Sequence, residues 1–196
     1  NATSTIQEVT EGYLNANVAA QSILTDTRYF GGTMVDLMTA RTLNSVRPIL
    51  RKDFVVDAFQ IVEAKAIGSD AVLLIAACLS KEELKNYGKL ATELGLSVLY
   101  EVHSQEELDK ISDLDGKIIG INNRNLKTFE VDLEHSIALA AQIPASCVKV
   151  SESGISNPRI ISGLKEYGFQ GFLIGENFMK TDNPGRACRQ FIDQIR

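Results

Sequence analysis

One unit recurs along the chain: an amphipathic segment, a glycine, one to three further residues and a short apolar segment. Three copies are clear. Their glycines are Gly68, Gly95 and Gly168, and the apolar segments that follow cover residues 71–75, 97–100 and 171–174. A glycine in this place is typical of a helix that ends in a left-handed turn. The repeat therefore predicts helices that alternate with short strands.

The starts of the amphipathic segments carry helix-capping residues. Ser80 with Glu83, and Ser104 with Glu107, have the three-residue spacing of a capping box. Pro158 stands at a first helical position, where its missing N–H costs nothing. These signals place helix starts after residues 80, 104 and 157.

The apolar segments are hydrophobic throughout, which is typical of parallel strands that are buried on both faces. Seven segments fit this description, and they cover about residues 19–25, 47–52, 71–76, 97–102, 118–122, 147–152 and 171–175. Their regular spacing suits βα units joined by short loops, and no Pro/Ser-rich linker interrupts them. We expect one α/β domain over residues 1–196. It is either a doubly wound sheet or a (β/α)₈ barrel with seven of its eight strands visible.

Polar residues gather where five of these strands end. They are Arg51-Lys52-Asp53, Glu101-Val102-His103, Asn122-Asn123-Arg124, Ser151 to Gly154, and Gly175-Glu176-Asn177. In both architectures the carboxyl ends of parallel strands meet at one rim. We expect their lysine, arginine and glutamate side chains to share one site and to shift one another's pKa values.

Glycine stands at the turn after each of the last two strands, at Gly154 and Gly175. Glycine lets backbone N–H groups approach an anion closely, and the loops after the last two strands are the usual phosphate site of barrels. The pair favours a phosphorylated ligand.

The two histidines are less informative. His135 lies in a helical segment and is expected at the surface. His103 follows Glu101 by two residues, so it either faces the same side of the strand or begins the next loop. Neither has a serine or cysteine partner at a recognisable spacing, so a hydrolase triad has no support.

Composition narrows the class of partner. The net charge is −5 with no Lys/Arg block, which argues against nucleic acid or a membrane surface and favours a small molecule. The three cysteines are widely spaced and form no metal-ligand pair. The chain shows no apolar run long enough to span a membrane and no signal pattern, so we expect a cytoplasmic protein.

At this point the sequence resembles a known family, the indole-3-glycerol-phosphate synthases of tryptophan biosynthesis, which are (β/α)₈-barrel enzymes. The matching segments run in family order over essentially the whole chain. They are SILTDTRYFGG (22–32), PILRKDF (48–54), DAVLLIAA (70–77), LYEVHS (99–104), IGINNRNLKTFEVDL (119–133), VSESGIS (150–156) and FLIGENFMK (172–180).

The resemblance implies a carboxy-lyase that closes the ring of 1-(2-carboxyphenylamino)-1-deoxyribulose 5-phosphate with loss of CO₂ and water. It implies Lys52 as general acid on the ribulose carbonyl oxygen and Glu101 as a proton-transfer group. Glu152 would stabilise positive charge on the aniline nitrogen, and Asn122 and Arg124 would orient the substrate. No metal or organic cofactor is expected.

The resemblance also implies binding residues. The substrate contacts would be Phe30, Phe54, Leu74 and Leu126, and the phosphate loops would contain Ser153, Gly154, Gly175 and Glu176. Glu176 departs from the serine or threonine of some relatives. Because a carboxylate would repel phosphate, we expect its side chain to face away while its backbone serves the site.

Family members begin with an extra helix and a first strand that carries a glutamate and a lysine. This sequence shows neither, so we expect a barrel that is truncated at its N-terminal end, with little or no activity alone. An open sheet edge would then allow self-association.

Two other functions stay open. The chain could be a phosphate-ligand-binding barrel without catalysis. It could also be another phosphate-binding barrel enzyme such as phosphoribosylanthranilate isomerase, although Asn122 stands where that chemistry needs an aspartate.

Overall fold

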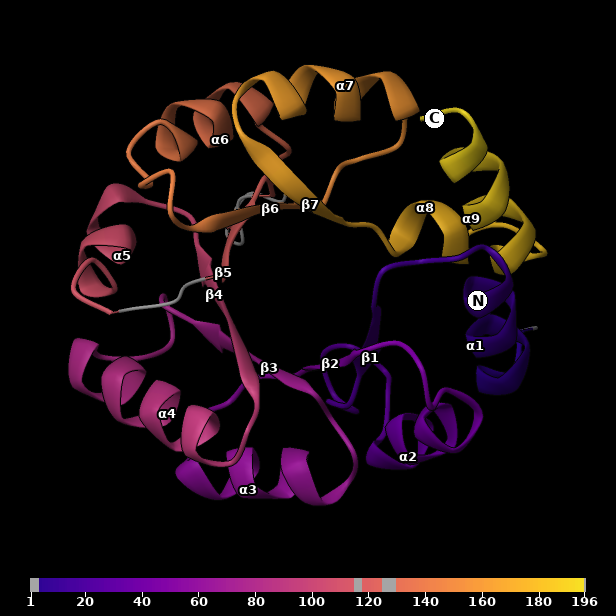
Figure 1. The fold of residues 1–196 in the computed structure, drawn as a ribbon, viewed down its shortest axis with the longest axis horizontal. Helices are drawn as coiled ribbons and strands as arrows, with labels where there is room; N and C mark the ends of the chain where they lie inside the picture. The colour runs from indigo at the N-terminus through magenta and orange to yellow at the C-terminus, as the bar shows by residue number, and fades with distance from the viewer. Residues whose placement is uncertain (1–3, 115–117, 125–129, 196) are drawn as a thin grey trace.

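The computed structural model describes residues 4–114, 118–124 and 130–195. Seven parallel strands form one sheet in the order of the chain, curved so that the helices surround it (Figure 1). The strands are β1 Gln21–Leu24, β2 Ile49–Lys52, β3 Ala71–Ile75, β4 Ser97–Val102, β5 Ile118–Asn122, β6 Val148–Glu152 and β7 Phe169–Leu173. The repeat left a doubly wound sheet and a (β/α)₈ barrel open, and this curved sheet (Figure 1) confirms the barrel class that the family resemblance implies.

Helices follow the strands along the outside of the sheet (Figure 1). They are α1 Ile6–Asn15, α2 Met34–Leu43, α3 Ala58–Ala66, α4 Lys81–Glu93, α5 Gln105–Lys110, α6 Leu133–Ala140, α7 Pro158–Glu166, α8 Glu176–Met179 and α9 Pro184–Asp193. The three repeat glycines have positive φ, at 97° for Gly68, 69° for Gly95 and 84° for Gly168, as helix-ending turns require.

Two local predictions needed correction. The last strand was expected over 171–175, but it begins at Phe169, directly after the left-handed Gly168, and its pairing with β6 is irregular between Lys149 and Val150. The Ser80 capping box is confirmed. The box at Ser104 forms only in part: the Ser104 hydroxyl caps α5, but the Glu107 carboxylate accepts the N–H of His103 instead of closing on Ser104.

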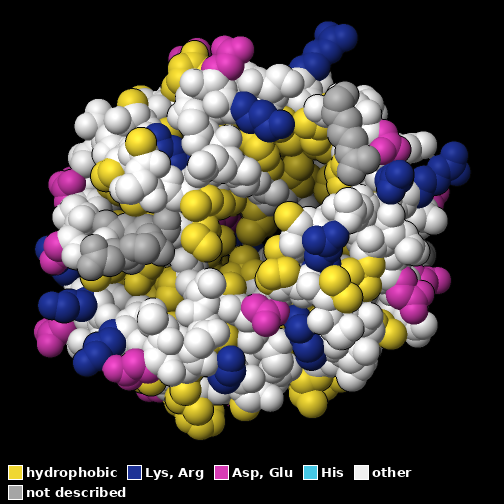
Figure 2. All heavy atoms as spheres, viewed as in Figure 1, with side chains coloured by type: hydrophobic (Ala, Val, Ile, Leu, Met, Phe, Trp, Pro, Cys, Tyr) yellow, Lys and Arg dark blue, Asp and Glu magenta, His cyan; other side chains and the backbone are white. Residues whose placement is uncertain are grey.

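Alternation along the strands separates two cores. The larger one lies between the sheet and the helices and includes Val72 and Leu74 of β3 with Ile61 of α3. The smaller one lies inside the curve of the sheet and includes Leu73 with Leu99. Figure 2 shows a hollow near the centre of the viewed face, with hydrophobic side chains around it. Residues two apart on a strand therefore share the inside or the outside.

Two helices lie side by side in the outer layer, beyond the two ends of the sheet (Figure 1). Strands β1 and β7 stand at the two ends of the sheet and do not pair with each other within the described residues. Beyond them α1 packs beside α9 (Figure 1). A Cβ on Gly12 would lie 2.8 Å from the Cα of Gly185, so the two helices touch backbone to backbone. The absence of a side chain at both positions allows this approach.

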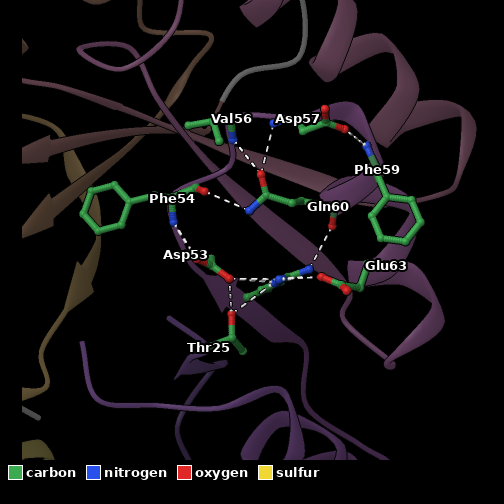
Figure 3. A network of polar contacts seen from close by, with 9 residues as sticks. Thr25, Asp53, Phe54, Val56, Asp57, Phe59, Gln60 and Glu63 are labelled. Atoms are coloured by element: carbon green, nitrogen blue, oxygen red, sulfur yellow. Dashed lines mark hydrogen bonds and ion pairs between the residues drawn. The ribbon is translucent and has the colours of Figure 1, made fainter. Parts of the chain in front are cut away.

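The loop after β2 is fixed by a buried polar network (Figure 3). Arg51 is 3% exposed and places its Nη2 2.9 Å from Asp53 Oδ2 and 2.8 Å from Glu63 Oε2. Thr25 Oγ1 donates to the same Asp53 oxygen at 2.6 Å. Gln60 Nε2 donates to the carbonyl oxygen of Phe54 at 2.9 Å. The network connects the ends of β1 and β2 to α3 and supports the loop that carries Phe54.

We expect Arg51→Met to lower the free energy of unfolding by about 3–5 kcal/mol, because it leaves the buried Asp53 carboxylate without its guanidinium. The exposed pair of Arg189 with Asp193 is the control, and Arg189→Met should cost below about 1 kcal/mol. Urea denaturation of both variants measures the difference. Equal losses would contradict a structural role for the Arg51 network.

Candidate active site

Three ionisable side chains meet inside the sheet at the carboxyl ends of alternate strands. Lys52 ends β2, Glu101 lies near the end of β4 and Glu152 ends β6. Lys52 Nζ is 3.2 Å from Glu101 Oε2 and 3.2 Å from Glu152 Oε2. The structure thus brings together the lysine and both glutamates that the sequence placed at one rim.

The surrounding strand residues make room for this cluster. Asn122, at the end of β5, donates from Nδ2 to Glu101 Oε1 at 3.0 Å. A Cβ on Gly120 would lie 2.0 Å from Glu152 Oε1, so a larger residue there would displace the carboxylate. Glu152 is 1% exposed, and its Oε1 has no hydrogen-bond partner in the described part of the chain. Burial without a donor leaves the negative charge of this carboxylate poorly stabilised.

The cluster divides its charge unequally. Burial raises the pKa of Glu152 to about 7, and the nearby Glu101 carboxylate adds to this rise while Lys52 opposes it. For Lys52, burial favours the neutral amine, but the two carboxylates outweigh it and the pKa is raised. Lys52 is therefore an ammonium at neutral pH.

Burial also disfavours the ionised form of Glu101, yet the net pKa of this carboxyl is lowered. The Lys52 ammonium contributes most to that lowering, followed by the Asn122 amide and by His103. An ammonium that holds its proton, beside one ionised and one readily protonated carboxyl, can donate a proton and take one back. This is an arrangement for general acid–base chemistry.

Aromatic side chains stand on the two loops after β1 and β2. Phe30 and Phe54 are stacked with ring centroids 4.9 Å apart and an interplanar angle of 11°. Tyr29 contacts Phe54 edge-on at 5.6 Å and is 67% exposed. The sequence predicted Phe30 and Phe54 as substrate contacts but did not single out Tyr29 as a member of this aromatic group. Its exposure, which would have marked it out, appears only in the fold.

One predicted substrate contact, Leu74, does not join this group. Leu74 is fully buried in the outer core, on the opposite face of β3 from Leu73, and so the structure does not bring it to the site. The sequence run 71–75 is apolar on both faces, which hides the alternation that separates them. Leu126 lies outside the described residues.

The loop after β6 has an unusual backbone. Ser153 and Gly154 have consecutive positive φ values of 67° and 68°. Asn123, which is 2% exposed, holds this loop: its Nδ2 donates to Ser153 O at 2.7 Å and to Ser151 Oγ at 3.0 Å. The sequence had placed Asn123 at the rim without a role, and the structure makes it the anchor of the predicted phosphate loop.

The other predicted phosphate loop is connected to β5. Gly175 is the N-cap of the short helix α8, and Glu176 is its first residue. The Glu176 carboxylate forms an ion pair with Arg124, with Nη2 2.7 Å from Oε2. The side chain of Glu176 is 79% exposed. This ion pair connects Arg124, just after β5, to the first residue of α8.

Within the described residues, no group of three or more His, Cys, Asp or Glu side chains is placed to hold a metal ion. No helix in the described ranges is both long and apolar enough to cross a membrane.

Comparisons with known proteins agree with the geometry. The sequence model of the family described as indole-3-glycerol phosphate synthase matches residues 1–191. The indole-3-glycerol phosphate synthase of Bacteroides thetaiotaomicron is 52% identical over 97% of this chain and 72% of its own length. That of a Polaromonas species is 43% identical over 93% of this chain and 69% of its own.

Among solved structures, a 3-hexulose-6-phosphate synthase superimposes with a TM-score of 0.77 over 97% of this chain and 93% of its own. At 14% identity this likeness concerns the fold alone. The family match and the curated relatives decide the classification, and the chain belongs to the indole-3-glycerol phosphate synthase family.

Proposed function

We propose that this protein is a carboxy-lyase that converts 1-(2-carboxyphenylamino)-1-deoxyribulose 5-phosphate to indole-3-glycerol phosphate. The observation that carries the proposal is the Lys52 ammonium, held 3.2 Å from each of two buried glutamates inside the sheet. Turnover of this substrate, followed by the appearance of the indole product, tests it. Binding without turnover would favour the alternative of a non-catalytic phosphate-ligand barrel.

Lys52 donates its proton to the ribulose carbonyl oxygen while C2′ bonds to the ring carbon that bears the carboxylate. That carboxylate leaves as CO₂, and its bonding electrons restore the aromatic ring. The hydroxyl formed at C2′ takes up a second proton and departs as water, and a proton released from C1′ to the Lys52–Glu101 pair leaves the C1′–C2′ double bond of the indole ring. Glu101 moves protons to and from Lys52. The Glu152 carboxylate stabilises positive charge on the aniline nitrogen, because a buried charge interacts more strongly than one in water.

The remaining residues position the substrate. The stacked Phe30 and Phe54 offer an apolar wall for its aromatic ring. Asn122 and Arg124 orient the substrate from the end of β5. The phosphate lies against the backbone of Ser153, Gly154, Gly175 and Glu176. A cytoplasmic location and self-association through the strand edges stay predictions of the sequence.

We expect Lys52→Met in the intact protein to lower kcat about 10²–10⁴-fold and to change KM little, because a general acid acts in the transition state. Lys89→Met, on the exposed face of α4, is the control and should leave both constants unchanged. Steady-state kinetics measure the two effects. An unchanged kcat in Lys52→Met would remove this lysine from the mechanism.

The raised pKa of Glu152 predicts a pH dependence. The proposed role needs the carboxylate, which is present above the pKa and is lost as the pH falls through about 7. In the parent protein kcat/KM should therefore rise with pH across this region. In Glu152→Gln it should be lower about 10²-fold or more, with this rise absent. A variant that retains the rise would show that another group titrates there, and exposed Glu166→Gln is the control.

We expect Glu176→Gln to bind inorganic phosphate about twofold to fivefold more tightly. The substitution removes a negative charge near the proposed phosphate loop and releases Arg124, and exposed charge pairs have effects of this size. Titration calorimetry with phosphate measures the change. Glu166→Gln again serves as the control. Weaker or unchanged binding in Glu176→Gln would argue against a phosphate site at Gly175.

A further inference from the structure

His103 lies between two carboxylates at the edge of the acid–base cluster. Its Nε2 is 4.0 Å from Glu101 Oε1, and its Nδ1 is 3.6 Å from Glu107 Oε2. It follows directly after β4, in the loop before α5, and its ring still faces the side of Glu101. Both sequence alternatives for His103 therefore hold in part. His135 is exposed on α6, as expected.

The His103 ring is largely enclosed. The side chain is 15% exposed, and both ring nitrogens are buried without a hydrogen-bond partner in the described part of the chain. A neutral imidazole with two unsatisfied nitrogens in such a place has little to stabilise it. A protonated ring is attracted by a carboxylate on each side, so the geometry favours the charged form.

Glu107 is held in place beside the ring. Its Oε2 accepts the backbone N–H of His103 at 2.7 Å, and its own backbone N–H is capped by Ser104 Oγ at 3.3 Å. This is the carboxylate that would otherwise have completed the capping box at Ser104. The sequence spacing of a capping box thus produces a clamp on His103 instead.

Glu101 receives different partners on its two oxygens. Oε2 faces the Lys52 ammonium, while Oε1 accepts from Asn122 and faces His103. Lys52 also forms an ion pair with Glu152, so its positive charge is divided between two carboxylates. A protonated His103 on the Oε1 side adds positive charge beside Glu101, which offsets the part of the Lys52 charge that Glu152 attracts.

We propose that His103 is a positioning residue: held as an imidazolium by Glu107, it keeps Glu101 a carboxylate beside Lys52. The inference rests on the proposed function, in which Glu101 accepts protons. His103 acts through Glu101 and has no contact of its own with the reacting atoms. When His103 is neutral or absent, the pKa of Glu101 rises toward that of Glu152. The two carboxyl groups then compete for the first proton that the pair takes up.

The pKa of His103 agrees with the geometry. Burial lowers it, but the Glu107 and Glu101 carboxylates outweigh burial and the net pKa is raised. Several titratable or charged groups lie near the ring and its two carboxylates. They are Glu101 of β4, Glu107 and Lys110 of α5, His135 of α6, Lys52 of β2, Glu152 of β6, Cys78 after β3 and the backbone of Arg124 after β5. Because the pKa is raised, the imidazolium charge is present at low pH and is lost as pH rises through the pKa. Its effect on Glu101 is therefore largest on the acidic side.

The experiment measures ionisation directly and activity separately. NMR titration of the ring signals should show His103 titrating above about 6.5, the ordinary value for histidine, and moving down in Glu107→Gln. The ¹³C carboxyl signal of Glu101 should titrate about one pH unit higher in His103→Gln than in the parent. His135→Gln removes the other histidine, whose Nε2 lies 2.7 Å from the carbonyl oxygen of His103, and should change neither titration.

The kinetic readout is the pH profile of kcat/KM in the intact protein. The limb near pH 7 that is assigned to Glu152 should remain in His103→Gln, and protonation of Glu101 should add a further loss of about tenfold on its acidic side that recovers at higher pH. A uniform loss at every pH, or a His103 that is neutral at pH 6, would overturn the proposal. If His103→Gln fails to fold, Glu107→Gln gives the same test through a smaller shift. An inactive parent protein would contradict the proposed function, while the Glu101 titration would still decide the role of His103.

Discussion

The ammonium of Lys52 between two buried carboxylates is the contact on which the rest of the site depends. It requires the ends of β2, β4 and β6 at one height inside a curved parallel sheet, and the strand register supplies this. It also requires glycine at position 120, because the Cβ of any other residue there would occupy the space of the Glu152 carboxylate. A lysine with one carboxylate would be a simple ion pair, whereas two carboxylates share its charge and are left with different proton affinities.

The opposite face of the same strands gives this cluster a rigid support. Arg51 precedes Lys52 and points away from it, into a buried network with Asp53 and Glu63 that fixes β2 against α3. Two neighbouring cations on one strand thus have different tasks, because consecutive side chains lie on opposite faces. The network also fixes the loop that carries Phe54 (Figure 3). The Phe54 ring stacks on Phe30 of the loop after β1.

Charge around the site is balanced in pairs that connect separate loops. Glu107 with His103 links α5 to the end of β4, and Arg124 with Glu176 links the end of β5 to α8. The first pair is largely enclosed and therefore influences the ionisation of its neighbours, whereas Glu176 is exposed and water weakens its interactions. Burial therefore determines how far each pair can affect proton transfer.

Local sequence patterns were enough to determine the elements. The glycine-ended helices, the Ser80 cap and the apolar strands of this chain follow from backbone sterics and burial. They predicted parallel strands with Lys52, Glu101 and Glu152 at one rim, but left a doubly wound sheet and a barrel open. Tertiary structure decided which face of each strand a residue occupies and which partner a side chain chooses. Leu74 faces outward, and Glu107 reaches His103 in place of Ser104. These outcomes depend on contacts between residues far apart in the chain and on the burial of individual atoms, which no short stretch of sequence contains.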